Sequence, residues 1–437
     1  MATEIEAPAA GPADKALLRF LTCGSVDDGK STLIGRLLYD SQAVLADQLA
    51  SLERDSRRFG TTGDEIDLAL LLDGLEDERQ QGITIDVAYR FFATGRRSFI
   101  VADSPGHEQY TRNMATGAST ADLALLLVDA RKGVVAQTRR HSLICSLLGI
   151  RHVVLTVNKL DLVDFDRARF ETIAEDYRRF AAELQFASLE AIPISARYGD
   201  NVTRRSSRIL WYQGPSLIEY LETVDVAGRG ERTGFRFPVQ WISRPHGDFR
   251  GVAGTVAAGS VAPGDPVVVA GSGVETRIKE IVTFNGAVPR AAAGDAVTLT
   301  FAQEIDVTRG DLLTSPASRA QSADQFAAHI IWMKDEPLVP GRSYWLKIGP
   351  RTVTATVTAL KHRIDVDSGA HIAARNLALN EIGFCNLSTG QPIAFDPYAM
   401  NRETGGFILI DRFTNETAGA GMIDFGLRRA TNVHLQA

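Results

Sequence analysis

The chain is poor in cysteine, with three in 437 residues, at Cys23, Cys145 and Cys385. These residues lie far apart and have none of the short spacings that metal-binding cysteines share, so the sequence predicts neither a disulfide framework nor a structural zinc site. We expect them to be small buried residues of a protein in a reducing compartment, which indicates the cytoplasm.

Long apolar runs and blocks of positive charge are also missing. No stretch is apolar over the roughly 20 residues that a membrane-spanning helix needs, and no secretory signal is recognisable at the start of the chain. The formal net charge is −6, and no block of Lys and Arg of the kind that grips nucleic acid occurs. We therefore expect neither a membrane nor a nucleic acid as a partner.

A glycine-rich segment is the most informative feature that is present. Residues 24–31 read GSVDDGKS, which fits the phosphate-binding pattern G-x-x-x-x-G-K-[ST]. Apolar residues from Leu17 to Cys23 predict a strand before it, and helical spacing from Thr32 to Leu38 predicts a helix after it. In that context the loop N–H groups and the helix N-terminus bind phosphate. Lys30 should reach the β- and γ-phosphates, and Ser31 should ligate Mg²⁺.

The segment DSPGH at residues 103–107 follows another predicted strand. Asp103 is expected to be the second Mg²⁺ anchor, acting through a water. Gly106 has no side chain, so its N–H can approach a γ-phosphate, and a peptide that moves when that phosphate leaves makes a switch. We expect the adjacent His107 to orient the attacking water. Thr84, earlier in the chain, is the candidate switch threonine, whose hydroxyl would close on Mg²⁺.

Two later segments are expected to bind the base. Asn158, Lys159 and Asp161 follow a β-branched strand, at the end where open α/β sheets bind ligands. The Asp161 carboxylate can accept from N1–H and N2–H₂ of guanine, which adenine does not offer. The stem of Lys159 can lie on the ring face. Backbone N–H groups at Ser195 and Ala196 would meet the guanine oxygen.

The ordered set of segments therefore predicts a GTP site with Mg²⁺. Asp27 and Asp28 either touch a Mg²⁺-bound water or only cap the turn. The expected catalytic residues are His107, Lys30, Thr84 and Gly106, and the expected metal ligands are Ser31, Thr84 and Asp103. The expected nucleotide-binding residues are Gly24, Ser25, Val26, Asp27, Asp28, Gly29, Lys30, Ser31, Thr32, Asp103, Ser104, Pro105, Gly106, His107, Asn158, Lys159, Asp161, Ser195, Ala196 and Arg197.

The organisation of the chain changes once, near residue 225. Before it strands alternate with helical stretches, which predicts an α/β P-loop GTPase domain with a mostly parallel sheet and flanking helices. After it helical periodicity almost disappears, and short strands with turns between them favour two small β-barrel domains. The expected divisions are a disordered tail at 1–13, the GTPase domain at 14–227, the second domain at 228–325 and the third at 326–437, with a linker at 228–234.

The run from Arg79 to Ile85, together with the DSPGH and NKLD segments, resembles the translation-factor class of GTPases. Four linking segments are unlike aminoacyl-tRNA carriers and resemble the large, GTP-hydrolysing subunit of bacterial ATP sulfurylase (CysN type). These segments are residues 47–56, 67–75, 107–119 and 129–134, and the resemblance extends from about residue 17 to 430. It implies the same three-domain plan and gives His107 the role of orienting the hydrolytic water.

The resemblance also implies a function. GTP hydrolysis would drive the conversion of ATP and sulfate to adenosine 5′-phosphosulfate and pyrophosphate, the first step of sulfate assimilation. No second phosphate-binding loop occurs, so we expect no fused adenylylsulfate kinase, and the adenylyl transfer would take place on a separate small catalytic subunit (CysD type) that binds ATP and sulfate. The native assembly would be a heterodimer or a set of heterodimers. The alternative is a translation-type GTPase that delivers tRNA or a release factor to the ribosome.

Overall fold

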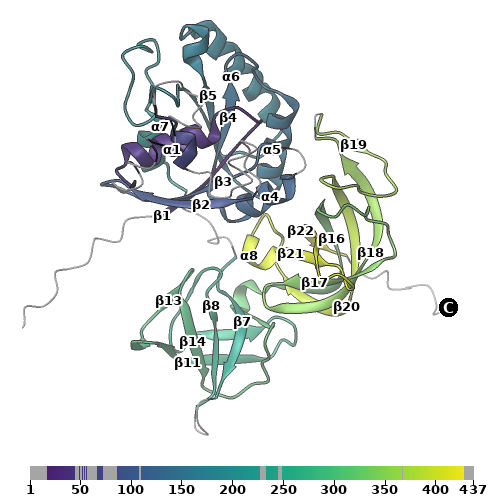
Figure 1. Ribbon diagram of the computed structural model, residues 1–437. Coiled ribbons are helices and arrows are strands. Elements are labelled where there is room, and N and C mark those ends of the chain that lie inside the picture. The colour runs from purple at the N-terminus through teal and green to yellow at the C-terminus, as the bar shows by residue number, and fades with distance from the viewer. Residues whose placement is uncertain are drawn as a thin grey trace, which may run out of the picture. The chain divides into compact units, whose positions relative to one another are not determined.

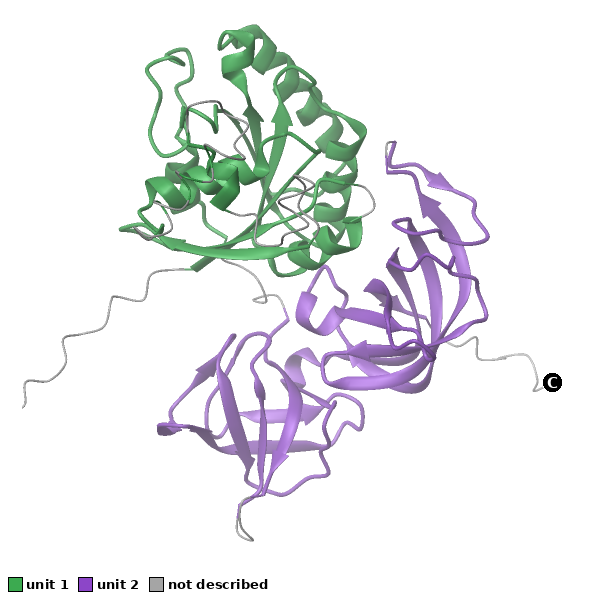
Figure 2. Ribbon diagram, viewed as in Figure 1, with its two compact units in different colours: residues 1–226 green, residues 227–437 purple. Residues whose placement is uncertain are grey.

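A computed structural model of the chain describes residues 17–44, 66–71, 86–107, 110–226, 233–244, 249–366 and 368–427, and also positions 49, 52, 54 and 56. The chain forms two compact units, residues 1–226 and 227–437 (Figure 2). Thr84, the tail at 1–13 and most of the predicted linker lie outside the described residues. The domain limits drawn from the sequence remain a proposal.

The first unit is a six-stranded sheet with helices on both faces (Figure 1). The strand order is β2-β3-β1-β4-β5-β6, in which β2 runs antiparallel to β3 and all other neighbours are parallel. The strands are β1 (Leu17–Gly24), β2 (Ala88–Ala93), β3 (Ser98–Asp103), β4 (Leu123–Asp129), β5 (His152–Asn158) and β6 (Ser188–Pro193). The helices are α1 (Lys30–Asp40), η1 (Leu68–Leu71), α4 (Thr111–Thr120), α5 (Ala136–Leu147), η3 (Leu160–Val163), α6 (Arg167–Ala181) and α7 (Leu217–Thr223).

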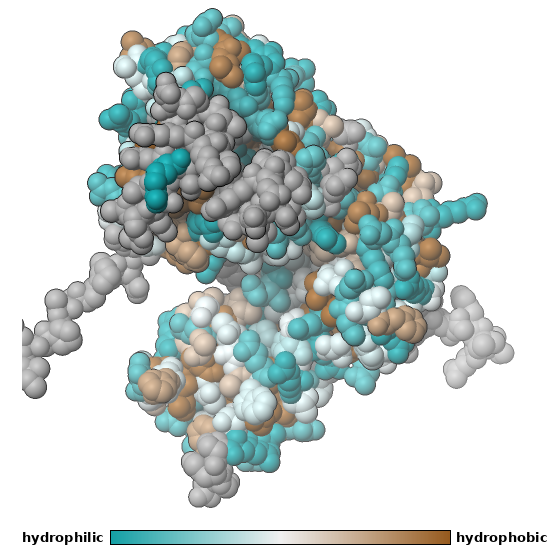
Figure 3. Space-filling model, in the orientation of Figure 1, coloured by the Kyte–Doolittle hydropathy of each residue, from teal (hydrophilic) through white to brown (hydrophobic). Residues whose placement is uncertain are grey.

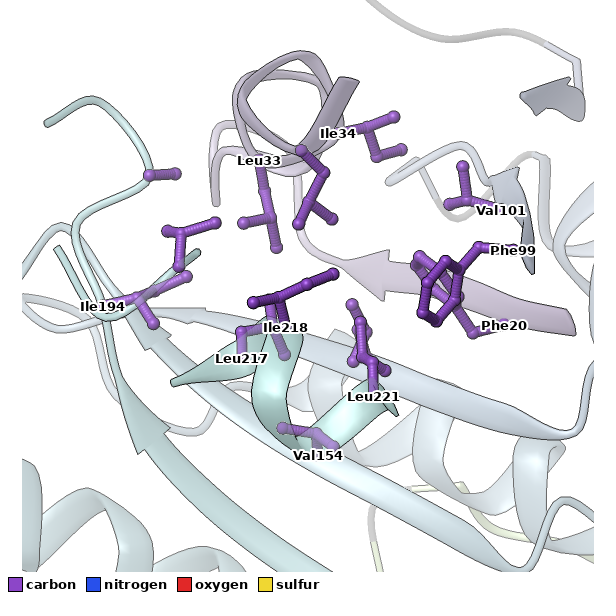
Figure 4. Packing of buried hydrophobic residues seen from close by; sticks show 14 of the residues in the cluster. Phe20, Leu33, Ile34, Phe99, Val101, Val154, Ile194, Leu217, Ile218 and Leu221 are labelled. Atoms are coloured by element: carbon purple, nitrogen blue, oxygen red, sulfur yellow. The ribbon is translucent and has the colours of Figure 1, made fainter. Parts of the chain in front are cut away.

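The core of this unit explains the strand sequences. All seven residues of β4 are buried, as expected for a central parallel strand that is covered on both faces. One face is covered by α1 and α7, whose Leu33, Ile34 and Leu221 pack towards Phe20 and Val154 of the sheet (Figure 4). This packing holds the start of α1, and with it the loop before α1, at a fixed place on the edge of the sheet.

The second unit consists of two closed antiparallel barrels. In the first, the order β10-β15-β7-β8-β14-β11 closes through a β10–β11 pairing, and in the second the order β17-β21-β22-β16-β20-β18 closes through β17–β18. The first barrel and its additions are β7 (Arg236–Ser243), β8 (Gly251–Thr255), β9 (Ser260–Val261), β10 (Pro266–Val269), β11 (Glu275–Thr283), β12 (Gly286–Val288), β13 (Ala291–Ala292), β14 (Ala296–Phe301), β15 (Leu312–Thr314) and η4 (Pro316–Ser318). The second contains β16 (Gln321–Trp332), β17 (Ser343–Ile348), β18 (Arg351–Ile364), β19 (His371–Ile372), β20 (Ile382–Phe395), α8 (Arg402–Gly405), β21 (Gly406–Ile410) and β22 (Thr417–Gly426).

The predicted fold class is confirmed, with a mostly parallel α/β unit followed by two β-barrels. The strands expected around Tyr344–Gly349 and Val353–Val357 form the antiparallel hairpin of β17 and β18. The strand expected at Phe407–Asp411 is β21. Among the described residues no helix is long and apolar enough to cross a membrane. On the face shown in Figure 3, apolar residues stand singly or in small groups among hydrophilic ones, which is normal for a folded protein.

A buried ion pair links the two barrels of the second unit. The guanidinium of Arg236, in β7, donates to both oxygens of Asp396 at 2.8 and 2.9 Å, and the two side chains are 2% and 6% exposed. The Thr404 hydroxyl also donates to Asp396 at 2.7 Å, and Arg236 donates to the Ser318 carbonyl. The Asp396 carboxylate therefore accepts three hydrogen bonds. Removing it would leave a buried guanidinium without its counter-charge.

We expect Asp396→Ala to lower the free energy of unfolding of the second unit by about 3–5 kcal/mol, because it leaves Arg236 buried and uncompensated. Chemical denaturation followed by circular dichroism measures this loss. The control is Glu171→Ala, since Glu171 pairs with Arg167 on the surface of α6 and should cost less than about 1 kcal/mol. Equal losses for the two variants would show that the buried pair is not a major stabilising element.

Candidate functional site

The predicted nucleotide-binding residues gather at one edge of the first sheet. Strands β1, β3, β4, β5 and β6 are mutually parallel, so their carboxyl ends lie together, at the edge where open α/β sheets bind ligands. Gly29 caps the N-terminus of α1 with a φ of 90°, a left-handed conformation that favours glycine. A Cβ at Gly29 would lie 2.4 Å from the side-chain nitrogen of Asn158, so the loop and the end of β5 are in close contact.

Lys30 is the first residue of α1 and is buried. Its Nζ donates to the carbonyls of Gly24 at 3.1 Å and Ser25 at 2.8 Å, so the ammonium is held against the loop. Burial lowers the pKa of Lys30, and the negative charges of Asp103 and Asp28 oppose that change. A fixed cation at the start of a helix that follows a glycine-rich loop is suited to binding the oxygens of a phosphate chain.

Gly106 lies directly against the loop. A Cβ built on it would be 2.6 Å from Nζ of Lys30 and 2.8 Å from the backbone nitrogen of Val26, so any other residue would clash. The structure therefore brings together the loop lysine and the glycine that we expect to contact the γ-phosphate, although they are far apart in the sequence. This close approach is the reason for a glycine at position 106.

Two of the three residues expected to hold Mg²⁺ have described positions, at the end of β3 and in the first turn of α1. Asp103, at the end of β3, is 1% exposed and accepts a hydrogen bond from the Thr22 hydroxyl at 3.1 Å, while Ser31 follows Lys30 in α1. Ser104 donates to the Thr22 carbonyl at 2.6 Å and fixes the turn after β3. Within the described ranges no group of three or more His, Cys, Asp and Glu could hold a metal. A hydroxyl and one carboxylate still fit Mg²⁺, which takes few protein ligands and adds waters and phosphate oxygens.

The two acidic residues of the loop have different surroundings. The Asp28 side chain is 2% exposed and accepts from the Ser25 backbone N–H at 2.6 Å, so it caps the turn. Burial raises the pKa of Asp28, and the charge of Lys30 opposes that rise. Asp27 is exposed and has a φ of 67°. Of the two alternatives drawn from the sequence, the contacts of Asp28 match the turn cap.

The residues expected to bind the base meet at the ends of β5 and β6. Asn158 donates to the Asp28 carbonyl at 2.8 Å and accepts from the Ala196 N–H at 2.9 Å, so it joins the loop to the segment after β6. The Ser195 hydroxyl donates to the Asp161 carboxylate at 2.6 Å, and Asp161 is partly exposed. These contacts orient a carboxylate at the edge of the site, where it can accept from the N–H groups of a purine.

One residue of the site was not predicted from the sequence. Asp129, the last residue of β4, is paired in register with Asn158 and lies 3.3 Å from Nζ of Lys159. The Arg131 side chain binds the same carboxylate at 2.6 and 3.0 Å. Burial alone would raise the pKa of Asp129, but the hydrogen bonds from Arg131 and the charge of Lys159 outweigh burial and hold the pKa at about 2.

For two predicted residues the described contacts do not reach the loop. His107 is exposed, and its ring contacts Tyr110 edge-on with 6.4 Å between the centroids. Arg197 extends over the Tyr198 ring, while its carbonyl accepts from Arg36. Thr84 has no described position, so its expected contact with Mg²⁺ remains a prediction.

Comparison with known families agrees with this architecture. Residues 15–227 match the Elongation factor Tu GTP binding domain, which places a GTP-binding domain on the first unit. Residues 325–424 match the GTP-eEF1A C-terminal domain-like family, which covers most of the second barrel.

Full-length relatives define the family more narrowly. Bifunctional enzyme NodQ of Rhizobium sp. (strain N33) is 65% identical over 97% of this chain and 66% of its own length. Bifunctional enzyme CysN/CysC of Xylella fastidiosa (strain Temecula1 / ATCC 700964) is 58% identical over 97% of this chain and 68% of its own. This chain thus spans about two thirds of the length of these bifunctional relatives.

A third relative has nearly the same extent as this chain. Sulfate adenylyltransferase subunit 1 of Aeromonas salmonicida (strain A449) is 56% identical over 94% of this chain and 88% of its own length. The resemblance stated from the linking segments is thereby confirmed. The chain belongs to the sulfate adenylyltransferase subunit 1 family of enzymes, and its first unit is a GTPase domain of the elongation factor Tu type.

Proposed function

We propose that this chain is the GTP-hydrolysing subunit of a sulfate adenylyltransferase. In one reaction, water attacks the γ-phosphorus of GTP and the bond to the β–γ bridging oxygen breaks, which gives GDP and phosphate. In the other, a sulfate oxygen attacks the α-phosphorus of ATP and pyrophosphate leaves, which gives adenosine 5′-phosphosulfate. Hydrolysis of GTP drives the second reaction, which takes place on a separate small subunit in the cytoplasm.

The observation that carries this proposal is the 56% identity to a protein named sulfate adenylyltransferase subunit 1 over most of both chains. The number in that name implies a partner subunit. A second observation supports the separation of the two reactions, because residues 24–31 are the only match to the phosphate-binding pattern in the 437 residues. We therefore assign the site described above to GTP and propose that ATP binds to the partner.

The chain's own residues would act on GTP by position and charge. Lys30 would place its ammonium on the β- and γ-phosphates, and the N–H of Gly106 would bind a γ-phosphate oxygen. Ser31, Asp103 and Thr84 would hold Mg²⁺, which supplies positive charge to the same phosphates. Asp161 would select guanine, with Asn158 and Ala196 fixing the pocket around it. His107 would orient the attacking water.

Coupling to the partner follows from the same residues. Gly106 packs closely on the loop, so a γ-phosphate bound by its N–H would influence the position of Gly106 and of the segment after it, which includes His107 and Tyr110. A partner subunit that touches this segment would sense whether GTP or GDP is bound.

The proposal is tested by isolating the chain from its own cell lysate and assaying the eluate for sulfate-dependent release of pyrophosphate from ATP, with and without GTP. We expect a smaller protein to co-purify and GTP to raise the release. Retention of charged tRNA or ribosomes, with no sulfate-dependent release, would instead assign the chain to translation.

His107→Ala should slow GTP hydrolysis by about 10²-fold or more, the scale of a positioned general acid–base group, while GTP binding is retained. Because the His107 side chain is exposed, the fold should tolerate the change. Single-turnover hydrolysis and nucleotide titration measure the two effects, with His371→Ala on the second barrel as the control. A loss of nucleotide binding in His107→Ala would make His107 a structural residue.

A further inference from the structure

The carboxylate of Asp129 is fully buried beside the base-binding residues, and two cationic side chains contact it. Its side chain is 0% exposed and receives the Arg131 backbone N–H at 2.9 Å, the two Arg131 side-chain contacts and the Nζ of Lys159. Two cations thus share one buried negative charge, although the Arg131 side chain itself is 49% exposed. Such a carboxylate orients the groups that bind it more firmly than a surface ion pair does.

Lys159 is held from two sides. Its ammonium contacts Asp129 at 3.3 Å and also donates to the backbone carbonyl of Asp27 in the phosphate-binding loop. Its backbone is left-handed, with a φ of 59°. The contacts with Asp129 and Asp27 therefore fix the end of the Lys159 side chain. In the sequence this lysine directly follows Asn158 and stands two residues before Asp161.

The turn that carries Asp129 is itself anchored. Arg169 of α6 donates to the carbonyls of Ala130 at 2.7 Å and Arg131 at 2.8 Å, and the Ala130 N–H donates to the Asn158 carbonyl at 2.9 Å. Because α6 and β5 both hold this turn, Asp129 has little freedom to follow a displaced lysine. A group that positions a ligand contact needs such support.

We propose that Asp129 is a positioning residue for nucleotide binding, which holds the stem of Lys159 in the place where it packs on the face of the guanine ring. The inference rests on the proposed GTP site and adds a residue to it. Arg131 neutralises the remaining charge of the carboxylate and makes no contact with the nucleotide. Asp129 therefore acts on affinity for the purine face and has no part in recognising the guanine edge.

Asp129→Asn should weaken the binding of GTP and of GDP by about tenfold or more, the scale of a lost hydrogen bond between charged groups. The binding of ITP should weaken by the same factor, because inosine differs from guanosine only in lacking the 2-amino group that Asp161 is expected to bind. The control is Asp122→Asn, at the other end of β4, where the carboxylate accepts the Arg19 N–H at 2.9 Å. That variant should leave the affinities for all three nucleotides unchanged.

Two further variants separate positioning from a structural role. In a Lys159→Ala background, Asp129→Asn should change the affinity for GTP by less than about twofold, the limit for additive effects. A further loss as large as the one that Asp129→Asn causes in the unaltered protein would overturn the inference. Arg131→Ala keeps the Asp129–Lys159 contact and should also stay within about twofold. A tenfold loss in Arg131→Ala would show that Asp129 acts through its own turn, which contradicts the inference.

The same titrations distinguish this inference from the proposed function. If Asp161→Asn alters the preference among GTP, ITP and XTP while Asp129→Asn binds all three normally, only the role of Asp129 is overturned. If Asp161→Asn leaves the preference unchanged, the guanine site itself is wrong, and the inference fails with it.

Discussion

The Lys30→Ala variant is expected to lose GTP hydrolysis, with turnover lower by about 10²- to 10³-fold or more, the scale of one preorganised electrostatic group. Lys30 is buried at the start of α1, and Gly24 and Ser25 hold its ammonium against the loop. Lys159, which also contacts the loop, is not free to replace it, because its ammonium is already held by Asp129 and Asp27. Phosphate release under saturating GTP measures the loss.

The matched control for this variant is Lys347→Ala, since Lys347 is an exposed lysine on β17 of the second barrel. Its turnover should equal that of the unaltered protein. Circular dichroism of both variants checks that the fold is retained. Near-normal hydrolysis by a folded Lys30→Ala protein would remove the phosphate-binding loop from the mechanism.

Asp161→Asn should change the base preference of the site from guanine to xanthine. The variant loses the carboxylate that accepts two N–H groups of guanine, so GTP binding should weaken by about 10²-fold or more. The amide that replaces it can donate to the 2-carbonyl oxygen of xanthine, and XTP should therefore bind better than GTP. Competition of GTP, XTP and ITP against a labelled nucleotide measures the change.

Asp164→Asn is the control for the xanthine experiment. Asp164 follows η3 and has an exposed side chain and a φ of 52°, a conformation that Asn adopts readily. Its nucleotide preference should be unchanged. Unaltered GTP affinity in Asp161→Asn would contradict the assignment of Asp161 to the guanine edge.

Much of the fold follows from local sequence because the apolar patterns agree with the elements. The β-branched run at Val153–Val157 lies within β5, and the helix expected from Thr32 to Leu38 lies within α1. The sequence is less informative at β20, which continues through Thr389–Pro392 although Gly and Pro there favour a turn. The pairing with β16 jumps from Ala323↔Ile393 to Gln325↔Ser388, so an irregularity absorbs the bend.

The residues of the site also differ in how far the sequence could predict them. The loop, Asp103 and Asn158 could be predicted because each has a motif and follows a strand. Asp129 could not, because its role depends on the register of β4 with β5 and on the left-handed backbone of Lys159. Apart from its place in the linking segment 129–134, the sequence offers one signal, an acidic residue at the end of a buried strand on the same edge as Asp103.

The central claim is that GTP hydrolysis drives sulfate adenylylation, and it is tested most directly with the chain purified together with its small subunit. The measurement is sulfate-dependent pyrophosphate release from ATP in the presence of GTP or of a non-hydrolysable GTP analogue. We expect GTP to raise the release in step with phosphate production and the analogue to fail to do so. Equal release with GTP and with the analogue would contradict the claim, because nucleotide binding alone would then suffice.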